Sequence, residues 1–143
     1  MKVQQISIFI ENIPGRLAEA TKVLGDAGVN IRALSLADTS DFGVLRLIVD
    51  KNDLAKQVLA EHDFTVSKTD VVAVEVPDRP AGLADILQEL DAAGITVEYL
   101  YAFVERLGDN AVIIFRFDNV DGAVKTLRDK GIKILPGESV YNL

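Results

Sequence analysis

The chain has 143 residues, of which 49% are hydrophobic, and its formal net charge is −7. It has no cysteine, which excludes disulfides and thiol chemistry, and a histidine-based site could use only His62. The acidic charge argues against nucleic acid as a partner, and no apolar run approaches the ~20 residues that span a membrane. The start of the chain lacks the features of a secretory signal, so we expect a cytoplasmic location.

The first elements predicted along the chain are a strand, a tight turn and a helix. Apolar side chains alternate over Ile6–Ile10, which is the period of a strand. Pro14 and Gly15 follow as a turn. From Leu17 to Ala27 apolar residues recur every three or four positions, as on one face of a helix. Gly28 stands where a left-handed residue would end that helix.

Two more strands are predicted at residues 30–37 and 42–50, followed by a short helix. Asn52 or Asp53 is expected to cap this helix. A fourth strand at residues 64–67 completes the unit.

The whole pattern then recurs. Residues 6–34 match residues 72–100 at an offset of 66, so that Pro14 corresponds to Pro80 and Gly28 to Gly94. After a small insertion in the second repeat the offset becomes 68, so that Asp50 corresponds to Asp118 and Leu59 to Leu127. We therefore predict two domains, residues 1–69 and residues 70–143, with almost no linker near residues 68–71. Each has the order βαββαβ, so the fold class is α+β: two ferredoxin-like units with antiparallel sheets and helices on one face.

The sheet face opposite the helices carries apolar side chains in both repeats. Third-strand residues predicted to point away from the helices include Val44 and Ile48 in the first repeat and Val112 and Ile114 in the second. Such a surface is too apolar to face water. We interpret it as packing between the units or against a second chain, and we expect a homodimer. A nucleic-acid platform is the alternative, which the acidic charge disfavours.

The turn after the first strand is the candidate binding site. Pro14 fixes φ and Gly15 lacks a side chain, so the loop backbone can approach a ligand closely. The loop opens onto a helix N-terminus, which favours an anion such as a carboxylate. Asn12 offers a donor and an acceptor, and Arg16 could pair with a carboxylate. The alternative is an ordinary turn with ordinary cap residues.

The spacing of these residues matches a known family. The βαββαβ order with "ENIPGRL" after the first strand and "DAGVNI" before the second resembles the ACT domain over nearly the whole chain. The resemblance implies a free-standing pair of amino-acid-sensing domains, neither catalytic nor dependent on a metal or cofactor. Its expected ligand is an amino acid or related carboxylate, held at an interface between units, and its expected partner is a metabolic enzyme. The ligand-binding residues implied are Asn12, Ile13, Pro14, Gly15, Arg16, Leu17, Asn30 and Ile31.

The sequence departs from that family at specific positions. Ile10 stands where some serine-binding members have a histidine, which puts serine in doubt as the ligand. In the second repeat Asp78 replaces the counterpart of Asn12, and Thr96 replaces that of Asn30. An aspartate would repel a ligand carboxylate. The second repeat is therefore expected to be structural or to bind something different.

Two other functions remain open at the level of sequence. One is a protein-interaction module that binds no ligand. The other is an acylphosphatase-like enzyme of the same topology, with Arg16 and Asn30 in the phosphate-binding and water-positioning roles. The loop lacks the glycine-rich phosphate cradle that such an enzyme requires, so we favour a non-enzymatic regulator.

Overall fold

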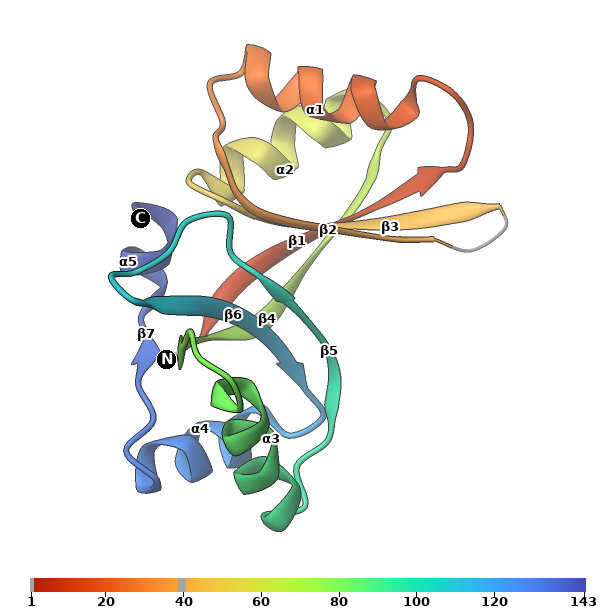
Figure 1. Cartoon of the computed structure of the whole chain (residues 1–143). Helices are drawn as coiled ribbons and strands as arrows, with labels where there is room; N and C mark the ends of the chain where they lie inside the picture. Colours follow the sequence, from red (N-terminus) through yellow and green to blue (C-terminus); the bar gives the residue numbers. More distant parts are fainter. Residues whose placement is uncertain (1, 39–40) are drawn as a thin grey trace. The chain divides into compact units, whose positions relative to one another are not determined.

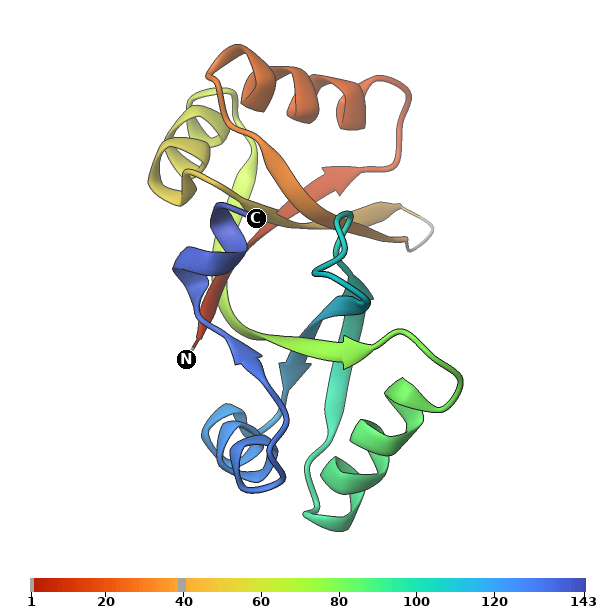
Figure 2. The same cartoon turned by 60° about the vertical axis from the view of Figure 1, so that its left-hand side comes forward.

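The computed structural model describes residues 2–38 and 41–143, which fold into two compact units. The first unit is Gln4–Thr69. The second is Asp70–Leu143 together with the start of the chain as far as Val3. Figure 1 shows the two helices of each unit lying together on one face of that unit's strands, and the turned view in Figure 2 shows the same layering.

The first unit contains β1 except for its first residue, two further complete strands, two helices and the first part of a fourth strand. Their order is β1 Val3–Glu11, α1 Arg16–Asp26, β2 Ile31–Asp38, β3 Phe42–Val49, α2 Asn52–Glu61 and β4 Thr65–Pro77. The strands lie in the order β2-β3-β1-β4, and β3 is antiparallel to both of its neighbours. The predicted α+β class with helices on one face of an antiparallel sheet is confirmed.

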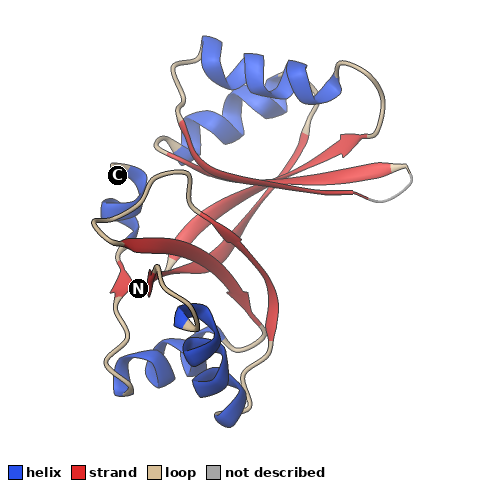
Figure 3. Cartoon of the chain, in the orientation of Figure 1, coloured by secondary structure: helices blue, strands red, loops and turns tan. Residues whose placement is uncertain are grey.

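The second unit repeats this plan with one short strand. Its elements are the rest of β4, α3 Gly82–Ala92, β5 Val97–Ala102, β6 Asn110–Phe117, α4 Val120–Asp129, β7 Ile134–Leu135 and α5 Gly137–Tyr141. β6 pairs with β4 and β5, and β7 pairs with the other edge of β4. Figure 3 separates these helices and strands by colour. Corresponding register shifts, between Ile31 and Ala33 and between Val97 and Tyr99, mark β2 and β5.

The alternating apolar residues enter two separate cores. Ile6, Ile8 and Ile10 of β1 are buried with Leu24 of α1 and Leu59 of α2. The second core has corresponding members, listed here together: Val72, Val74, Val76, Leu90 and Leu127. Each fully buried aliphatic side chain contributes roughly 1.5–3 kcal/mol through removal of apolar surface from water. The periodicity of the sequence therefore located both cores correctly.

The predicted helix ends are partly confirmed. Gly28 and Gly94 have φ of 77° and 73° just beyond α1 and α3, as a left-handed helix end requires. Asn119 caps α4, because its side-chain oxygen accepts from Gly122 N at 2.9 Å. For α2 the prediction was wrong: the residue before the helix is Lys51, without a side-chain cap bond.

The strand prediction at the domain boundary was also wrong. We predicted separate strands at residues 64–67 and 72–76, whereas β4 runs without interruption from Thr65 to Pro77. The intervening Lys68-Thr69-Asp70 segment reads as polar linker, but backbone pairing in a sheet does not require apolar side chains. The offset of 68 places the counterpart of the predicted 64–67 strand at residues 132–135. In the structure this strand is reduced to Ile134–Leu135, and the short helix α5 was not predicted. No helix in the described residues has the length and apolar character needed to cross a membrane.

Candidate functional site

The loop between β1 and α1 is a tight turn held by its own backbone. Asn12 N donates to Asp41 O at 3.0 Å, and Ile13 N donates to Glu11 O at 2.8 Å. Gly15, the residue before α1, has φ of 90°, a left-handed conformation that glycine adopts without the cost of a Cβ clash. Glycine at this position thus allows the strand to turn directly into the helix.

A small cleft of about 130 Å³ lies beside this loop. It is lined by Ile10, Glu11, Asn12, Ile13, Leu17, Leu36 and Gly43. Exposed apolar side chains border it, with 54% of Ile13, 39% of Leu17 and 50% of Leu36 accessible. The cleft therefore combines the Asn12 amide, a helix N-terminus and an apolar wall, which suits one end of a small carboxylate with an apolar side chain.

The structure brings only some of the predicted site residues into this cleft. Asn12, Ile13 and Leu17 line it, and Pro14 and Gly15 form the exposed turn above α1. Sequence reasoning missed Leu36 and Gly43, which reach the cleft from β2 and β3. The alternation of Leu34 and Leu36 with the small residues of β2 was the signal that could have found this wall.

Arg16 does not line this cleft. Its guanidinium carbon sits 4.2 Å from the centre of the Phe64 ring. One guanidinium nitrogen, Nη1, donates to Glu19 Oε2 at 2.9 Å, and Nε is 4.0 Å from Glu11 Oε1. With 21% of its side chain exposed, Arg16 is held against the unit by an aromatic ring and two carboxylates. A guanidinium engaged in this way is not presented to a phosphate, which argues against the acylphosphatase-like role.

Asn30 and Ile31 lie at the opposite end of α1. Asn30 N donates to Asp50 Oδ1 at 2.8 Å, and Asp50 N donates to Asn30 O at 3.2 Å. These bonds fix the start of β2. Because α1 has 11 residues, Asn12 and Asn30 are separated by a helix about 16 Å long. The first unit alone does not bring the two asparagines together.

The second repeat preserves the scaffold but changes the chemistry. Thr96 N donates to Asp118 Oδ1 at 3.0 Å, as Asn30 does to Asp50. Asp78, the counterpart of Asn12, pairs with Arg106 at 2.8 Å. Ala81 takes the place of Gly15 with φ of 66°, a conformation that costs a residue with a Cβ about 1 kcal/mol or more. The turn before α3 thus has a backbone shape similar to that of the turn before α1, but its polar side chain is the ion-paired carboxylate of Asp78.

No cluster of three or more potential metal-ligating His, Cys, Asp or Glu residues occurs in residues 2–38 and 41–143. His62, the one histidine, is exposed at the end of α2, with Nδ1 2.8 Å from Val58 O.

Comparisons with known proteins agree with this architecture. None of the curated proteins compared with the chain matches it in sequence. The crystal structure of protein BT0572 from Bacteroides thetaiotaomicron is 38% identical, with a TM-score of 0.94, and the match covers 100% of this chain and 98% of that one. The ligand-free regulatory subunit of aspartate kinase from Thermus thermophilus is 18% identical, with a TM-score of 0.59, covering 88% of this chain and 91% of that one. The corresponding subunit from Thermus flavus is 16% identical, with a TM-score of 0.57 and coverage of 88% and 90%.

A family model also matches nearly the whole chain. The model describes an ACT domain pair and covers residues 1–142. This range includes both βαββαβ repeats, the loop at Asn12–Leu17 and its counterpart before α3. The chain therefore belongs to the family of ACT domain pairs.

Proposed function

We propose that this protein is a non-enzymatic cytoplasmic regulator that senses an amino acid or a related small carboxylate at the Asn12–Leu17 loop. The ligand changes how two copies of the chain assemble, and the assembly state is read by a metabolic enzyme. The observation that carries the proposal is the cleft formed by Asn12, the start of α1 and the apolar side chain of Leu36.

The chemistry of the cleft supports a carboxylate ligand. The first N–H groups of an α-helix have no acceptor within the helix, and the helix dipole adds partial positive charge at this end. A ligand carboxylate at the start of α1 would accept from these groups. The Asn12 amide can serve either an ammonium or a carboxylate. Ile13, Leu17 and Leu36 would then contact the ligand's apolar part.

A second copy of the chain is needed to bring Asn30 and Ile31 to this cleft. β2 is the outermost strand of its sheet, and Leu34 and Leu36 on it are 47% and 50% exposed. An unpaired strand edge is a template for pairing with another strand. If two β2 strands pair antiparallel about a two-fold axis, the start of one lies beside the end of the other. The partner's Asn30 and Ile31 would then approach the Asn12 loop, and each dimer would hold two equivalent sites.

Such an arrangement supplies a regulatory mechanism. A ligand contacting both copies binds the dimer better than the monomer, so it shifts the population towards the dimer. The similarity to proteins described as regulatory subunits of aspartate kinase is compatible with this role. At 18% and 16% identity those structures support the shared fold, and the choice of amino acid and of target enzyme must come from experiment.

A thermal-shift screen of the purified chain against the twenty amino acids and related keto acids tests the ligand. A ligand specific to the folded state adds about 2.7 kcal/mol of apparent stability at a hundredfold excess over its Kd. We expect a selective shift that disappears in Asn12→Ala and Asn30→Ala and persists in Thr96→Ala, the matched change in the second repeat. A screen without any selective shift would contradict ligand sensing and favour the protein-interaction module.

Light scattering coupled to size-exclusion chromatography tests the assembly. Leu36→Asp places a charge on the exposed edge of β2, where it would be buried by strand pairing at a cost of several kcal/mol. We expect wild type to elute as a dimer and Leu36→Asp as a monomer that has lost the ligand response. Leu100→Asp on β5 is the control, since Leu100 is 38% exposed on the edge strand of the other repeat. A dimer that survives Leu36→Asp would contradict the arrangement.

A further inference from the structure

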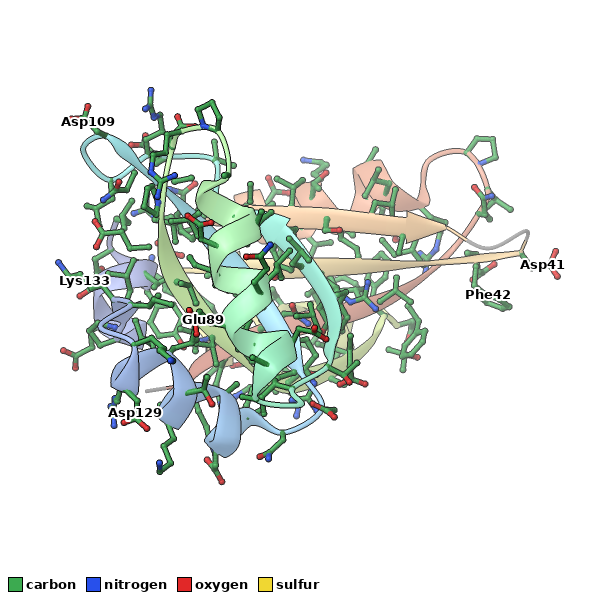
Figure 4. All side chains as sticks on the ribbon, turned by 60° about the horizontal axis from the view of Figure 1, so that its bottom comes forward. Asp41, Phe42, Glu89, Asp109, Asp129 and Lys133 are labelled. Carbon is green, nitrogen blue, oxygen red and sulfur yellow. The ribbon has the colours of Figure 1, made fainter. Side chains whose placement is uncertain are left out.

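The second repeat has a cleft of its own, of about 380 Å³. It lies between α3, the end of β4 and the segment that joins α4 to β7, so all of its walls belong to one unit. Ile86 and Ile132 contribute apolar surface, and three acidic and three basic side chains surround them. Figure 4 labels two of these, Glu89 on α3 and Lys133 just before β7.

The first repeat shows what occupies the corresponding place there. At the offset of 66 Arg16 corresponds to Gly82, and at the offset of 68 Phe64 corresponds to Ile132. In the first repeat the Arg16 guanidinium lies over the Phe64 ring and pairs with Glu19. In the second repeat neither the long cationic side chain nor the aromatic ring is present. The cleft is lined by the residues that stand in for them.

The missing side chain cannot be supplied at position 82. A Cβ built on Gly82 would lie 2.1 Å from Pro77 O, a backbone atom. Real Cβ atoms do not approach so closely, and backbone here has no freedom to yield. The close packing of β4 against the start of α3 therefore requires glycine and leaves the cleft open.

The least exposed of the three carboxylates that line the cleft is that of Glu75. The Glu75 side chain is 13% exposed, and its Oε1 accepts from Asn110 Nδ2 at 3.2 Å. Its cationic neighbour, Lys133, is 69% exposed, with Nζ 3.6 Å from Glu75 Oε2. Because the Lys133 side chain is largely exposed, its pairing with Glu75 contributes little free energy.

The other two carboxylates form the rim. Asp85, the counterpart of Glu19, pairs with Arg79 at 3.2 Å, and Glu89 pairs with Lys130 at 3.3 Å. Both basic side chains are more than half exposed. The charges of these two pairs thus cancel, and the less exposed Glu75 carboxylate lines the same cleft as Ile86 and Ile132.

We propose that this cleft binds a small molecule carrying a guanidinium or primary ammonium group on a short aliphatic chain. The cation pairs with Glu75, displacing the Lys133 ammonium. The aliphatic chain packs on Ile86 and Ile132. This site is separate from the Asn12 loop and does not depend on the function proposed for it.

Titration calorimetry with butylguanidinium as the probe tests the proposal, because this ion has no carboxylate that could bind the Asn12 loop. Butylurea is its neutral counterpart of nearly equal shape. We expect saturable binding of one butylguanidinium per chain and at least about tenfold weaker binding of butylurea. A charge-assisted hydrogen bond is worth about 1.5–3 kcal/mol, so Glu75→Gln should weaken the cation's affinity about tenfold or more.

Matched variants separate this site from general charge effects. Glu98→Gln removes an acidic side chain of β5 that pairs with Arg116 outside the cleft and should leave binding unchanged. Asn12→Ala should also leave it unchanged. Lys133→Met removes the competing ammonium and should tighten binding, a gain that a merely structural role of Glu75 does not predict.

Backbone amide NMR shifts on titration give the location, with Gly82 and Gly131 as reporters on opposite walls of the cleft. If Glu75→Gln does not fold, Asp85→Asn at the rim and Lys133→Met serve in its place. Absence of saturable butylguanidinium binding, equal binding of butylurea, or equal effects of Glu75→Gln and Glu98→Gln would each overturn the proposal.

Discussion

The contact between Arg16 and Phe64 should stabilise the first repeat measurably, and a double-mutant cycle isolates its contribution. The guanidinium carbon is 4.2 Å from the ring centre, and 21% of the arginine side chain is exposed. A cation over an aromatic face contributes about 0.5–2 kcal/mol, with the larger values for partly desolvated pairs. The ion pairs with Glu19 and Glu11 add about 0.2–1 kcal/mol, because both carboxylates are largely exposed.

We therefore expect Arg16→Met to lower the free energy of unfolding by about 1–2 kcal/mol, since methionine keeps much of the apolar stem but loses the charge. Phe64→Leu should cost a similar amount through lost packing. In the double variant the two losses should fall short of additivity by about 1 kcal/mol, because the cation–ring contact is lost only once.

Urea denaturation followed by circular dichroism measures all four proteins of the cycle. The control is Arg79→Met, an exposed arginine of the second repeat, for which we expect a change within about 0.5 kcal/mol. A coupling between Arg16 and Phe64 below about 0.3 kcal/mol would refute the reasoning, since distant and independent residues add to within that margin.

Three further changes test individual parts of the fold. Gly28→Ala forces alanine to a φ of 77° and should destabilise the protein by about 1 kcal/mol in thermal unfolding. The control is Gly25→Ala, inside α1 with open space around its Cβ position, which should stabilise the protein by roughly 0.5–1 kcal/mol. Equal effects of the two substitutions would contradict the assignment of Gly28 as the left-handed end of α1. Asn119→Ala removes the cap bond of α4 and should cost about 1 kcal/mol, and an unchanged melting temperature would argue against that cap. Lys68, hydrogen-bonded to Asp53, holds the pKa of that carboxyl below its ordinary value of 3.8. The stabilisation from this pair is present above the unfolded-state pKa of Asp53 and is lost as pH falls through the lower folded-state pKa. An NMR titration should therefore show an Asp53 midpoint that rises in Lys68→Met.

Much of the fold could be predicted because its determinants are local in sequence. The alternation of Ile6, Ile8 and Ile10 reflects a sheet with one face buried, and the three-and-four spacing after Leu17 reflects a helix resting on it. Because the chain contains an internal repeat, each pattern occurs twice, and each copy supports the prediction made from the other. Gly28 and Gly94 marked helix ends because glycine adopts their left-handed backbone conformation at the lowest cost.

The errors arose where pairing or packing outweighs local preference. Asn52 has good cap chemistry, yet the helix begins at that residue and Lys51 precedes it. The five residues of α5 are too few to display a period.

The candidate site shows the same limit. Asn12 and the turn were identifiable from residue types, but nothing near Arg16 in the sequence indicates that it turns towards Phe64, 48 positions later.

The continuity of β4 has a practical consequence for how this protein can be divided. A cut between Thr69 and Asp70 follows the sequence repeat but falls in the middle of a 13-residue strand. Each separated half would keep only part of that strand, with newly exposed backbone groups at the cut end. Such fragments are prone to aggregate or to exchange strands with one another. The two repeats, although recognisable as copies, should therefore be produced and studied as a single chain.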